Sequence, residues 1–248
     1  MLKEERQQLI LDRLYEYGNV TVNKLSDEFS VSKDSIRRDL SELEEQGILR
    51  RVFGGAVPFK MLTADIDKRM NVEKDKKYMV GRKAVALLKP ESLIAIDGGT
   101  TNLRFASLIP LPIKLRVVTN SFPVAEELRK RQRVDVIFLG GRINKESQTT
   151  IGETVLKQLA DYHFDQCFIG AYAVDAENGI TVPYPYDDEA AIKRYLVENS
   201  DDVNIMCALS KLDKVSNYNI CKIDSVSRII CEYPVQKEIQ NRYKEKIY

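Results

Sequence analysis

The chain of 248 residues has one histidine, four cysteines and no long apolar run, and each shortage excludes a class of protein. With no CxxC pairing, we expect no metal site and free, buried thiols in a reducing cytosol at Cys167, Cys207, Cys221 and Cys231. The N-terminal stretch MLKEERQQLILDRL is charged, which argues against a signal peptide or a membrane span. We therefore expect a soluble, cytoplasmic protein of two domains.

The sequence also has little net charge of either sign. The whole chain carries +1, and residues 1–57 hold nine Lys and Arg against eleven Asp and Glu, a net charge of −2. Bulk charge therefore gives no argument for a nucleic acid partner. Any such partner must be bound by a few well-placed cations or by a set that dimerisation doubles.

Residues 32–47, SKDSIRRDLSELEEQG, have the pattern of a helix that enters a DNA groove. Ser32 can cap the N-terminus and Gly47 can end the helix, while Ile36, Leu40 and Leu43 share one face. The outward N-terminal face carries donors for phosphate or guanine: Ser32, Lys33, Ser35, Arg37 and Arg38. The C-terminal half is acidic, which suits entry by the N-terminus. An ordinary amphipathic helix with a solvated charged face is the alternative.

The flanking sequence favours the DNA-binding interpretation. Helical patterns at 2–17 and 22–29 precede the 32–47 helix, and together they predict a helix-turn-helix. The next stretch, ILRRVFGGAV, alternates apolar with basic residues and turns at Gly54-Gly55. It predicts a β-hairpin wing whose Arg50 and Arg51 can contact a phosphate backbone. We place the DNA-binding domain at 1–57.

The remainder of the chain predicts a mostly parallel α/β domain. Residues 58–72 lack a clear period and are expected to be a linker, and residues 232–248 are expected to be a polar tail. Between them, over 73–231, short apolar runs predict strands at 93–97, 115–119, 134–139, 164–169, 203–209 and 228–231. Helical patterns alternate with them at 74–88, 101–109, 122–131, 153–162 and 187–199.

Small polar residues follow several of these strands, at the edge where doubly wound sheets bind ligands. The loop DGGTT at 97–101 leads directly into a helix, so its glycines, the Thr100 and Thr101 hydroxyls and free backbone N–H groups favour an anion. It is not a P-loop, and a glycine turn with a Thr cap is the alternative. Arg142 and Lys211 follow later strands, and Lys211 is either a phosphate partner or merely solvated.

Residues further along give weaker signals. Glu189 and Lys193 stand one helical turn apart, so both can face one cleft, or they can form a surface ion pair. No catalytic constellation stands out, and His163 is expected to be structural.

The motifs together resemble a known family. VTVNKLSDEFSVSKDSIRRDLSELEEQGILRRVFGGAV resembles the winged helix-turn-helix of DeoR-type bacterial transcription regulators, notably in IRRDL, LEEQG and GGA. DGGTTNL, VVTNSFPVAEEL, FLGGRIN, IGETV, FIGAYAVD, NGIT, EAAIKR and SK follow in the order of that family's sensor domain. The resemblance implies a fold similar to ribose-5-phosphate isomerase and a phosphorylated sugar bound without turnover. It implies a regulator, most often a repressor of carbohydrate-use genes.

The resemblance also assigns effector contacts and one departure. The implied contacts are Gly98, Gly99, Thr100, Thr101, Asn120, Gly141, Arg142, Glu189 and Lys211. Tyr172 stands where the family commonly has an acid, so we expect it to alter the sugar-hydroxyl end of the pocket. The partners implied are operator DNA and a sugar phosphate, with no cofactor, and a dimer or tetramer is expected. An active sugar-phosphate isomerase with a DNA-binding appendage and an α/β domain used only for oligomerisation are the alternatives.

Overall fold

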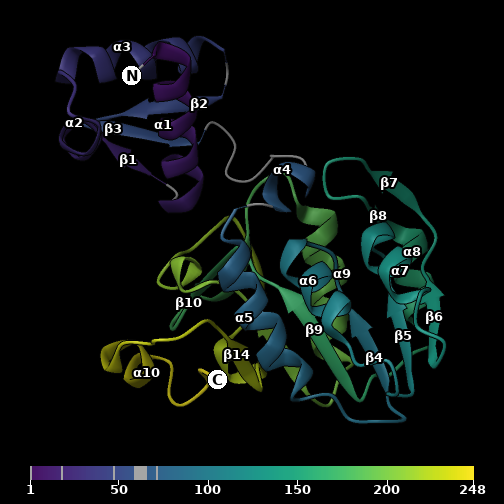
Figure 1. The fold of residues 1–248 in the computed structure, drawn as a ribbon. Helices are drawn as coiled ribbons and strands as arrows, with labels where there is room; N and C mark the ends of the chain where they lie inside the picture. Colours follow the sequence, from purple (N-terminus) through teal and green to yellow (C-terminus); the bar gives the residue numbers. More distant parts are fainter. Residues whose placement is uncertain (1, 18, 47, 59–65, 71) are drawn as a thin grey trace. The chain divides into compact units, whose positions relative to one another are not determined.

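The computed structural model describes residues 2–17, 19–46, 48–58, 66–70 and 72–248, which form two compact units (Figure 1). The first unit comprises the described residues up to 58 together with 72–73. The second unit comprises 66–70 and 74–248.

The first unit is a winged helix-turn-helix. Its elements are α1 (Lys3–Tyr17), β1 (Val20–Thr21), α2 (Val22–Phe29), α3 (Lys33–Glu45), β2 (Leu49–Val52) and β3 (Gly55–Pro58). Strands β2 and β3 form the predicted wing, and apolar residues of all three helices bury one core that includes Ile10, Leu25 and Ile36. Strand β1 was not predicted, because two residues carry no period. It pairs with β3 at Gly55, where a side-chain carbon would lie 1.9 Å from the Val20 carbonyl oxygen.

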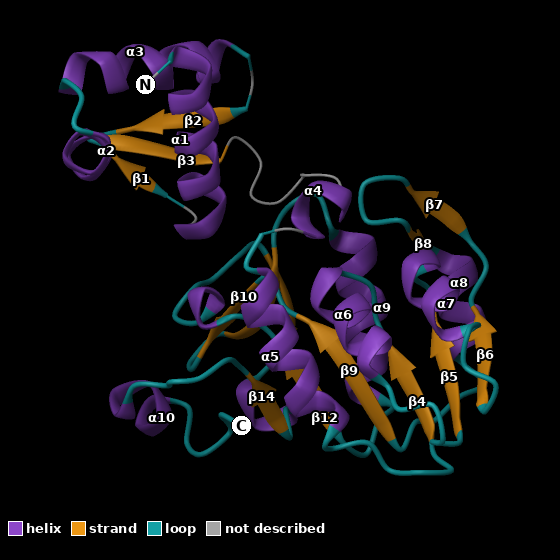
Figure 2. Ribbon diagram, viewed as in Figure 1, coloured by secondary structure: helices purple, strands orange, loops and turns teal. Residues whose placement is uncertain are grey.

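The second unit is built on a parallel sheet of six strands, in the order β14-β12-β9-β4-β5-β6 (Figure 2). All six predicted strands are confirmed, with shorter or slightly shifted bounds: β4 (Leu93–Ile96), β5 (Leu115–Thr119), β6 (Val134–Phe138), β9 (Gln166–Gly170), β12 (Val203–Met206) and β14 (Arg228–Ile230). Every neighbouring pair in this sheet is parallel.

Helices cover both faces of the sheet, because its strands alternate between two apolar cores. Ile94 and Ile96 face one core and Ala95 faces the other. The first core is closed by α5 (Lys74–Val85), α6 (Thr100–Leu108) and α7 (Phe122–Leu128). The second is closed by α8 (Glu153–Leu159) and α9 (Asp187–Glu198). The doubly wound fold predicted from the sequence is therefore confirmed.

The strand order places a switch point beside β4. The chain runs from β4 to β5 and β6 on one side, and β9, β12 and β14 then fill the other side. In doubly wound folds ligands bind where the connections diverge, which here is at the carboxyl ends of β4 and β9. The loop after β4 and Gly170 at the end of β9 thus flank the expected ligand position.

Two small antiparallel sheets were missed by the sequence analysis. One has the strands β10 (Ala173–Asp175), β11 (Gly179–Val182) and β13 (Tyr218–Cys221), and the other is the hairpin β7 (Arg142–Asn144) and β8 (Thr149–Ile151). The turn between β10 and β11 ends in Asn178-Gly179, which is a strong hairpin signal that the sequence did offer. Strands of three residues are otherwise too short to show alternation.

The segment 58–72 is not wholly a linker. Within it, α4 (Ile66–Met70) packs on the second unit, where Ile66 is buried and its backbone N–H donates to the Glu146 carbonyl at 3.1 Å. The expectation fails for α4 because five residues make little more than one turn, which is too short to reveal a helical period. The part at 59–65 lies outside the described residues.

The polar tail at 232–248 is also part of the second unit. Helix α10 (Lys237–Arg242) precedes Tyr243, whose ring is fully buried and whose hydroxyl donates to the Val174 carbonyl at 3.1 Å. Near the end of the chain, Ile247 pairs with Ile229 of β14. The expected surface helix exists, but a single buried tyrosine and an added sheet partner anchor the segment despite its polar composition.

Three of the four cysteines are buried and Cys221 is half-buried, and all four are free thiols, as expected. The described residues include no helix long and apolar enough to cross a membrane.

Candidate DNA-binding and effector sites

The N-terminus of α3 presents the predicted donors on its surface. The Ser32 hydroxyl accepts the backbone N–H of Ser35 at 3.2 Å, so the predicted cap is confirmed. Lys33, Ser35, Arg37 and Arg38 lie on this helix, and all except the half-buried Ser35 are exposed. Arg37 Nη1 donates to Asp34 Oδ1 at 2.8 Å, an exposed pair that a phosphate can replace.

Contacts with α1 and the wing engage the acids of α3. Asp39 is buried and accepts two hydrogen bonds from Arg6 of α1, at 2.5 and 3.1 Å. Glu42 binds Lys3 at 2.7 Å and Gln7 at 2.8 Å, and these hydrogen bonds lower the pKa of its carboxyl. Glu44 accepts the backbone N–H of Arg51 at 2.7 Å. These acids of α3 therefore have partners on α1 or the wing, whereas Asp34 lies with the cations at the N-terminus of the helix.

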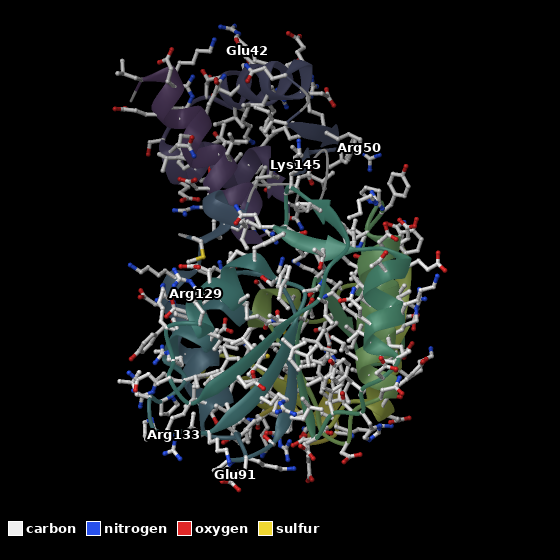
Figure 3. All side chains as sticks on the ribbon, turned by 90° about the vertical axis from the view of Figure 1, so that its right-hand side faces the viewer. Glu42, Arg50, Glu91, Arg129, Arg133 and Lys145 are labelled. Atoms are coloured by element: carbon white, nitrogen blue, oxygen red, sulfur yellow. The ribbon has the colours of Figure 1, made fainter. Side chains whose placement is uncertain are left out.

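The two wing arginines differ in their surroundings. Arg51 Nη1 donates to Ser41 of α3 at 2.9 Å, which ties the wing to the recognition helix. Arg50, the neighbouring residue of β2, is exposed and lies on a different side of this unit from Glu42 (Figure 3). Arg50 is thus the more available phosphate contact.

The loop after β4 forms a helix N-terminus open to an anion. Gly99 precedes α6 with φ of 108°, a conformation that favours glycine, and no atom lies within 4 Å of where its side chain would begin. No side-chain hydrogen bond caps α6, so its first backbone N–H groups lack the partner that a capping side chain would supply. Thr100 is buried and Thr101 is half-buried at the same helix start. The alternative of a Thr-capped turn is therefore wrong, because the capping position is Gly99.

A buried ion pair between Lys193 and Asp97 holds the loop that follows β4. Lys193 of α9 is 3% exposed and donates to the Asp97 carboxylate and, at 2.9 Å, to the Gly170 carbonyl. Asn102 donates to the Asp97 carbonyl at 2.9 Å and the Gly98 carbonyl at 3.1 Å. The surface ion pair considered for Glu189 and Lys193 is therefore wrong, since Lys193 turns inward to the end of β4.

The predicted contacts Asn120 and Gly141 have structural roles. Asn120 donates to the Thr150 carbonyl at 2.8 Å and joins β5 to β8. A side-chain carbon on Gly141 would lie 2.8 Å from Val155, so glycine is needed there for packing. Next to Asn120, the Ser121 hydroxyl is buried and has no hydrogen-bond partner among the described residues. Ser121 lies against Gly98, where a side-chain carbon would be 3.7 Å from its Cβ.

Charged residues line a cavity of about 560 Å³ between the β7–β8 hairpin and the start of α9. Arg142 pairs with Asp188 across it, and Lys145, Glu146 and Glu189 are also in its wall. Figure 3 shows Lys145 at the opposite end of this unit from Glu91 and Arg133, which precede strands at their amino ends. The cavity thus opens at the carboxyl side of the sheet.

Glu189 is held in a cluster with two tyrosines. The Tyr172 hydroxyl donates to Glu189 Oε2 at 3.1 Å, and the Tyr172 ring stacks on Tyr186 with ring centroids 5.3 Å apart. Burial raises the pKa of Glu189, while the nearby Lys193 opposes that rise. Burial, and secondarily the Glu189 charge, also raises the pKa of Tyr172. Tyr172, the family departure, therefore contacts the predicted effector residue Glu189 directly.

Lys211 lies in the short 3-10 helix η1 (Leu209–Lys211) after β12. It is half-buried, and its charge acts on the buried thiol of Cys207. Since β9 separates β12 from β4, Lys211 is two strands away from the Gly99 loop on the same carboxyl edge.

Three contributors to the site were not predicted from the sequence. Asp97 and Ser121 stand in the quoted strand-end motifs, so they were detectable as neighbours of Gly98 and Asn120. Arg69 of α4 was undetectable, since it stands in a segment without a period, yet its charge acts on Tyr172, Tyr186 and Glu189. No cluster of metal-ligating side chains occurs in the portion of the chain that the structure describes.

Comparison with known proteins assigns both units. Residues 6–60 match the DeoR-like helix-turn-helix domain, and residues 72–233 match the DeoR C terminal sensor domain. The HTH-type transcriptional regulator GlpR of Haloferax volcanii is 31% identical over 94% of this chain and 91% of its own length. The HTH-type transcriptional repressor GlcR of Bacillus subtilis is 28% identical over 94% of this chain and 89% of its own.

Among solved structures, ribose 5-phosphate isomerase A of Methanocaldococcus jannaschii is 17% identical, with a TM-score of 0.42 over 56% of this chain and 54% of its own. The translation initiation factor eIF-2B of Pyrococcus horikoshii is 13% identical, with a TM-score of 0.47 over 92% of this chain and 87% of its own. The family models span both units, and the matched relatives span nearly the whole chain. The chain therefore belongs to the DeoR family of DNA-binding transcriptional regulators.

Proposed function

We propose that the protein is a repressor of carbohydrate-use genes whose operator affinity is set by a phosphorylated sugar, bound without turnover. The observation that carries the effector site is the uncapped start of α6, beside the buried and unpartnered Ser121 hydroxyl. A helix N-terminus with free N–H groups favours a phosphate. The name of GlcR, a transcriptional repressor, supports the sign of regulation.

The effector lies along the carboxyl edge of the sheet in this proposal. Its phosphate contacts Gly98, Gly99, Thr100, Thr101 and Ser121, with Lys211 as the ammonium partner. Its sugar hydroxyls face Glu189 and Arg142. Asn120 and Gly141, which also position the neighbouring strands, complete the proposed effector contacts.

Operator DNA is bound by the N-terminus of α3 and by the wing. Ser32, Lys33, Ser35, Arg37 and Arg38 face the major groove, while Arg50 contacts phosphate and Arg51 supports the wing. With a net charge of −2 in this unit, specific binding requires a symmetric oligomer on repeated half-sites. Sedimentation should give a dimer or tetramer, and a monomer that binds one half-site with nanomolar affinity at physiological salt would contradict this.

The test of the effector site begins with a thermal-shift screen of sugar monophosphates and continues with calorimetry and operator binding. Lys211→Ala should weaken the effector about 10- to 100-fold, since a charged hydrogen bond contributes about 1.5–3 kcal/mol. Operator affinity without effector should stay normal. Lys157→Ala, which removes an exposed lysine of α8, is the matched control.

Two results would overturn the proposal. If wild type and Lys211→Ala bind the effector with equal affinity, the phosphate is bound elsewhere. If the bound sugar phosphate is converted to a product, the protein is an enzyme. Linkage supplies a further check. DNA must change effector affinity by the same factor by which the effector changes DNA affinity.

A further inference from the structure

Helix α4 belongs to the sensor unit and precedes its sheet in the chain. Its position is fixed by the buried Ile66 side chain, by the Ile66 N–H bond to Glu146 and by Lys77, which donates to the Arg69 carbonyl at 2.5 Å. The backbone that carries Arg69 is thus held by the sensor unit itself.

Two buried polar atoms near this helix have no hydrogen-bond partner among the described residues: Arg69 Nε and Glu189 Oε1. Burying such atoms without partners is costly, so each calls for an explanation. They belong to one cluster. The start of α4 bonds to the Glu146 backbone, the Glu146 carboxylate accepts from the Tyr186 hydroxyl at 3.4 Å, and Tyr186 stacks on Tyr172, which donates to Glu189. The Arg69 charge acts on the same Glu189 and tyrosines. One of the two atoms is a donor and the other an acceptor.

We propose that Arg69 is a specificity residue of the effector site, and that it binds a sugar hydroxyl jointly with Glu189. A hydroxyl can donate to Glu189 Oε1 while accepting the N–H of Arg69, and so satisfies both atoms at once. A phosphate is disfavoured here, since the acids of the adjoining wall, Glu146, Asp187, Asp188 and Glu189, outnumber its cations, Arg142 and Lys145. This inference rests on the proposed function and assigns the hydroxyl end of that site.

Helix α4 is the first element of the sensor unit in the sequence. Residue 66, where α4 begins, follows the DNA-binding unit after the residues 59–65, and the bound sugar touches α4 directly. Effector occupancy therefore acts on the first element of the sensor unit that follows the DNA-binding unit in sequence.

The test is calorimetry on the full chain with two probes: the tightest-binding sugar monophosphate from a panel of pentose and hexose phosphates, and inorganic phosphate. Arg69→Gln should weaken the sugar phosphate about 10- to 100-fold and leave inorganic phosphate unchanged, because phosphate alone uses the Gly99 end. Glu189→Gln should weaken the same probe, and the double variant should lose less than the two single losses combined.

Arg129→Gln, at an exposed position of the same unit, is the control and should bind both probes as wild type does. Arg69→Lys keeps the charge and replaces Arg69→Gln in the test if that variant fails to fold. It should also bind the sugar phosphate at least 10-fold more weakly than wild type does. Wild-type affinity in either variant, or an equal loss for both probes, overturns the Arg69 assignment alone. A wild-type chain that binds no member of the panel overturns the proposed function and this inference together.

Discussion

The two units each fix a functional element with a buried ion pair, but they present their functional groups in opposite ways. In the small unit, Arg6 and Asp39 tie α1 to the recognition helix, and the cations proposed to contact DNA are in water. In the sensor unit, Lys193 and Asp97 tie α9 to the end of β4, and the polar atoms around the candidate site are buried.

The difference follows from the size of the ligand. Side chains that bind DNA can stay exposed, because the surface of the duplex can contact them there, and they remain hydrated without a free-energy cost before DNA binds. A small ligand must be surrounded, so its partners are buried before it arrives, and some lack hydrogen bonds, as Ser121 Oγ, Glu189 Oε1 and Arg69 Nε do among the described residues. Most of the buried unpartnered atoms in the described residues therefore lie at the candidate small-ligand site, although Arg131 Nε, at the far end of α6, does not. The DNA-binding surface is distinguished instead by its local placement of charge.

The largest expected effect comes from breaking the deeper ion pair. Lys193→Met leaves Asp97 charged and buried, which should destabilise the sensor unit by about 3–5 kcal/mol. Denaturant titration combined with hydrogen exchange in β4 and β9 measures it. The double variant Asp97→Asn, Lys193→Met should recover much of the loss. A single-variant loss below about 1 kcal/mol would show that the pair is not truly buried.

The corresponding change in the small unit should cost less, because Arg6 is 15% exposed. Arg6→Met should destabilise that unit by about 1.5–3 kcal/mol and also weaken operator binding, since α3 loses its anchor on α1. Arg13→Met is the control: the Arg13–Glu28 pair is exposed and should be worth about 0–1 kcal/mol. Equal losses of stability in Arg6→Met and Arg13→Met would show that the Arg6–Asp39 pair contributes no more than an exposed pair.

Exposed cations should affect binding without affecting stability. Arg37→Ala and Arg38→Ala should each weaken operator binding by about 1–3 kcal/mol and leave the melting temperature unchanged. A residue that reads a base should also relax sequence preference, whereas one that holds phosphate should weaken all sequences alike. Fluorescence anisotropy with operator and scrambled duplexes separates the cases. If both variants bind operator DNA as tightly as wild type does, α3 does not enter the major groove.

The smallest effect depends on pH and arises from the buried carboxyl of Glu189. Because burial raises its pKa above the ordinary 4.5, the wild type loses stability as pH rises from that value through the raised one. Glu189→Gln lacks this loss, so its stability relative to wild type should increase over the same window and then level off. Urea titrations of both proteins at several pH values test the sign, and a constant difference would contradict it.

The helices and strands with a clear periodicity could be predicted from local sequence alone. The Ser32 cap, the apolar face of Ile36, Leu40 and Leu43, and six apolar strand runs each depend on neighbours within a few residues, and all are present in the fold. The parallel sheet followed from their alternation with helices. The loop at Gly98 and Gly99 was also predictable, because the glycine pair between a strand and a helix is a local signal.

The hydrogen-bond and ion-pair partners of the polar groups, in contrast, follow only from the tertiary fold. Lys193 belongs with Asp97 and not with Glu189, and Asn120 holds Thr150 while Ser121 lacks a partner. These pairings join residues far apart in the chain, so no local spacing encodes them. For the same reason, no local pattern indicates that the charge of Arg69, in an aperiodic segment, acts on Glu189, or that one buried side chain, Tyr243, anchors a polar tail.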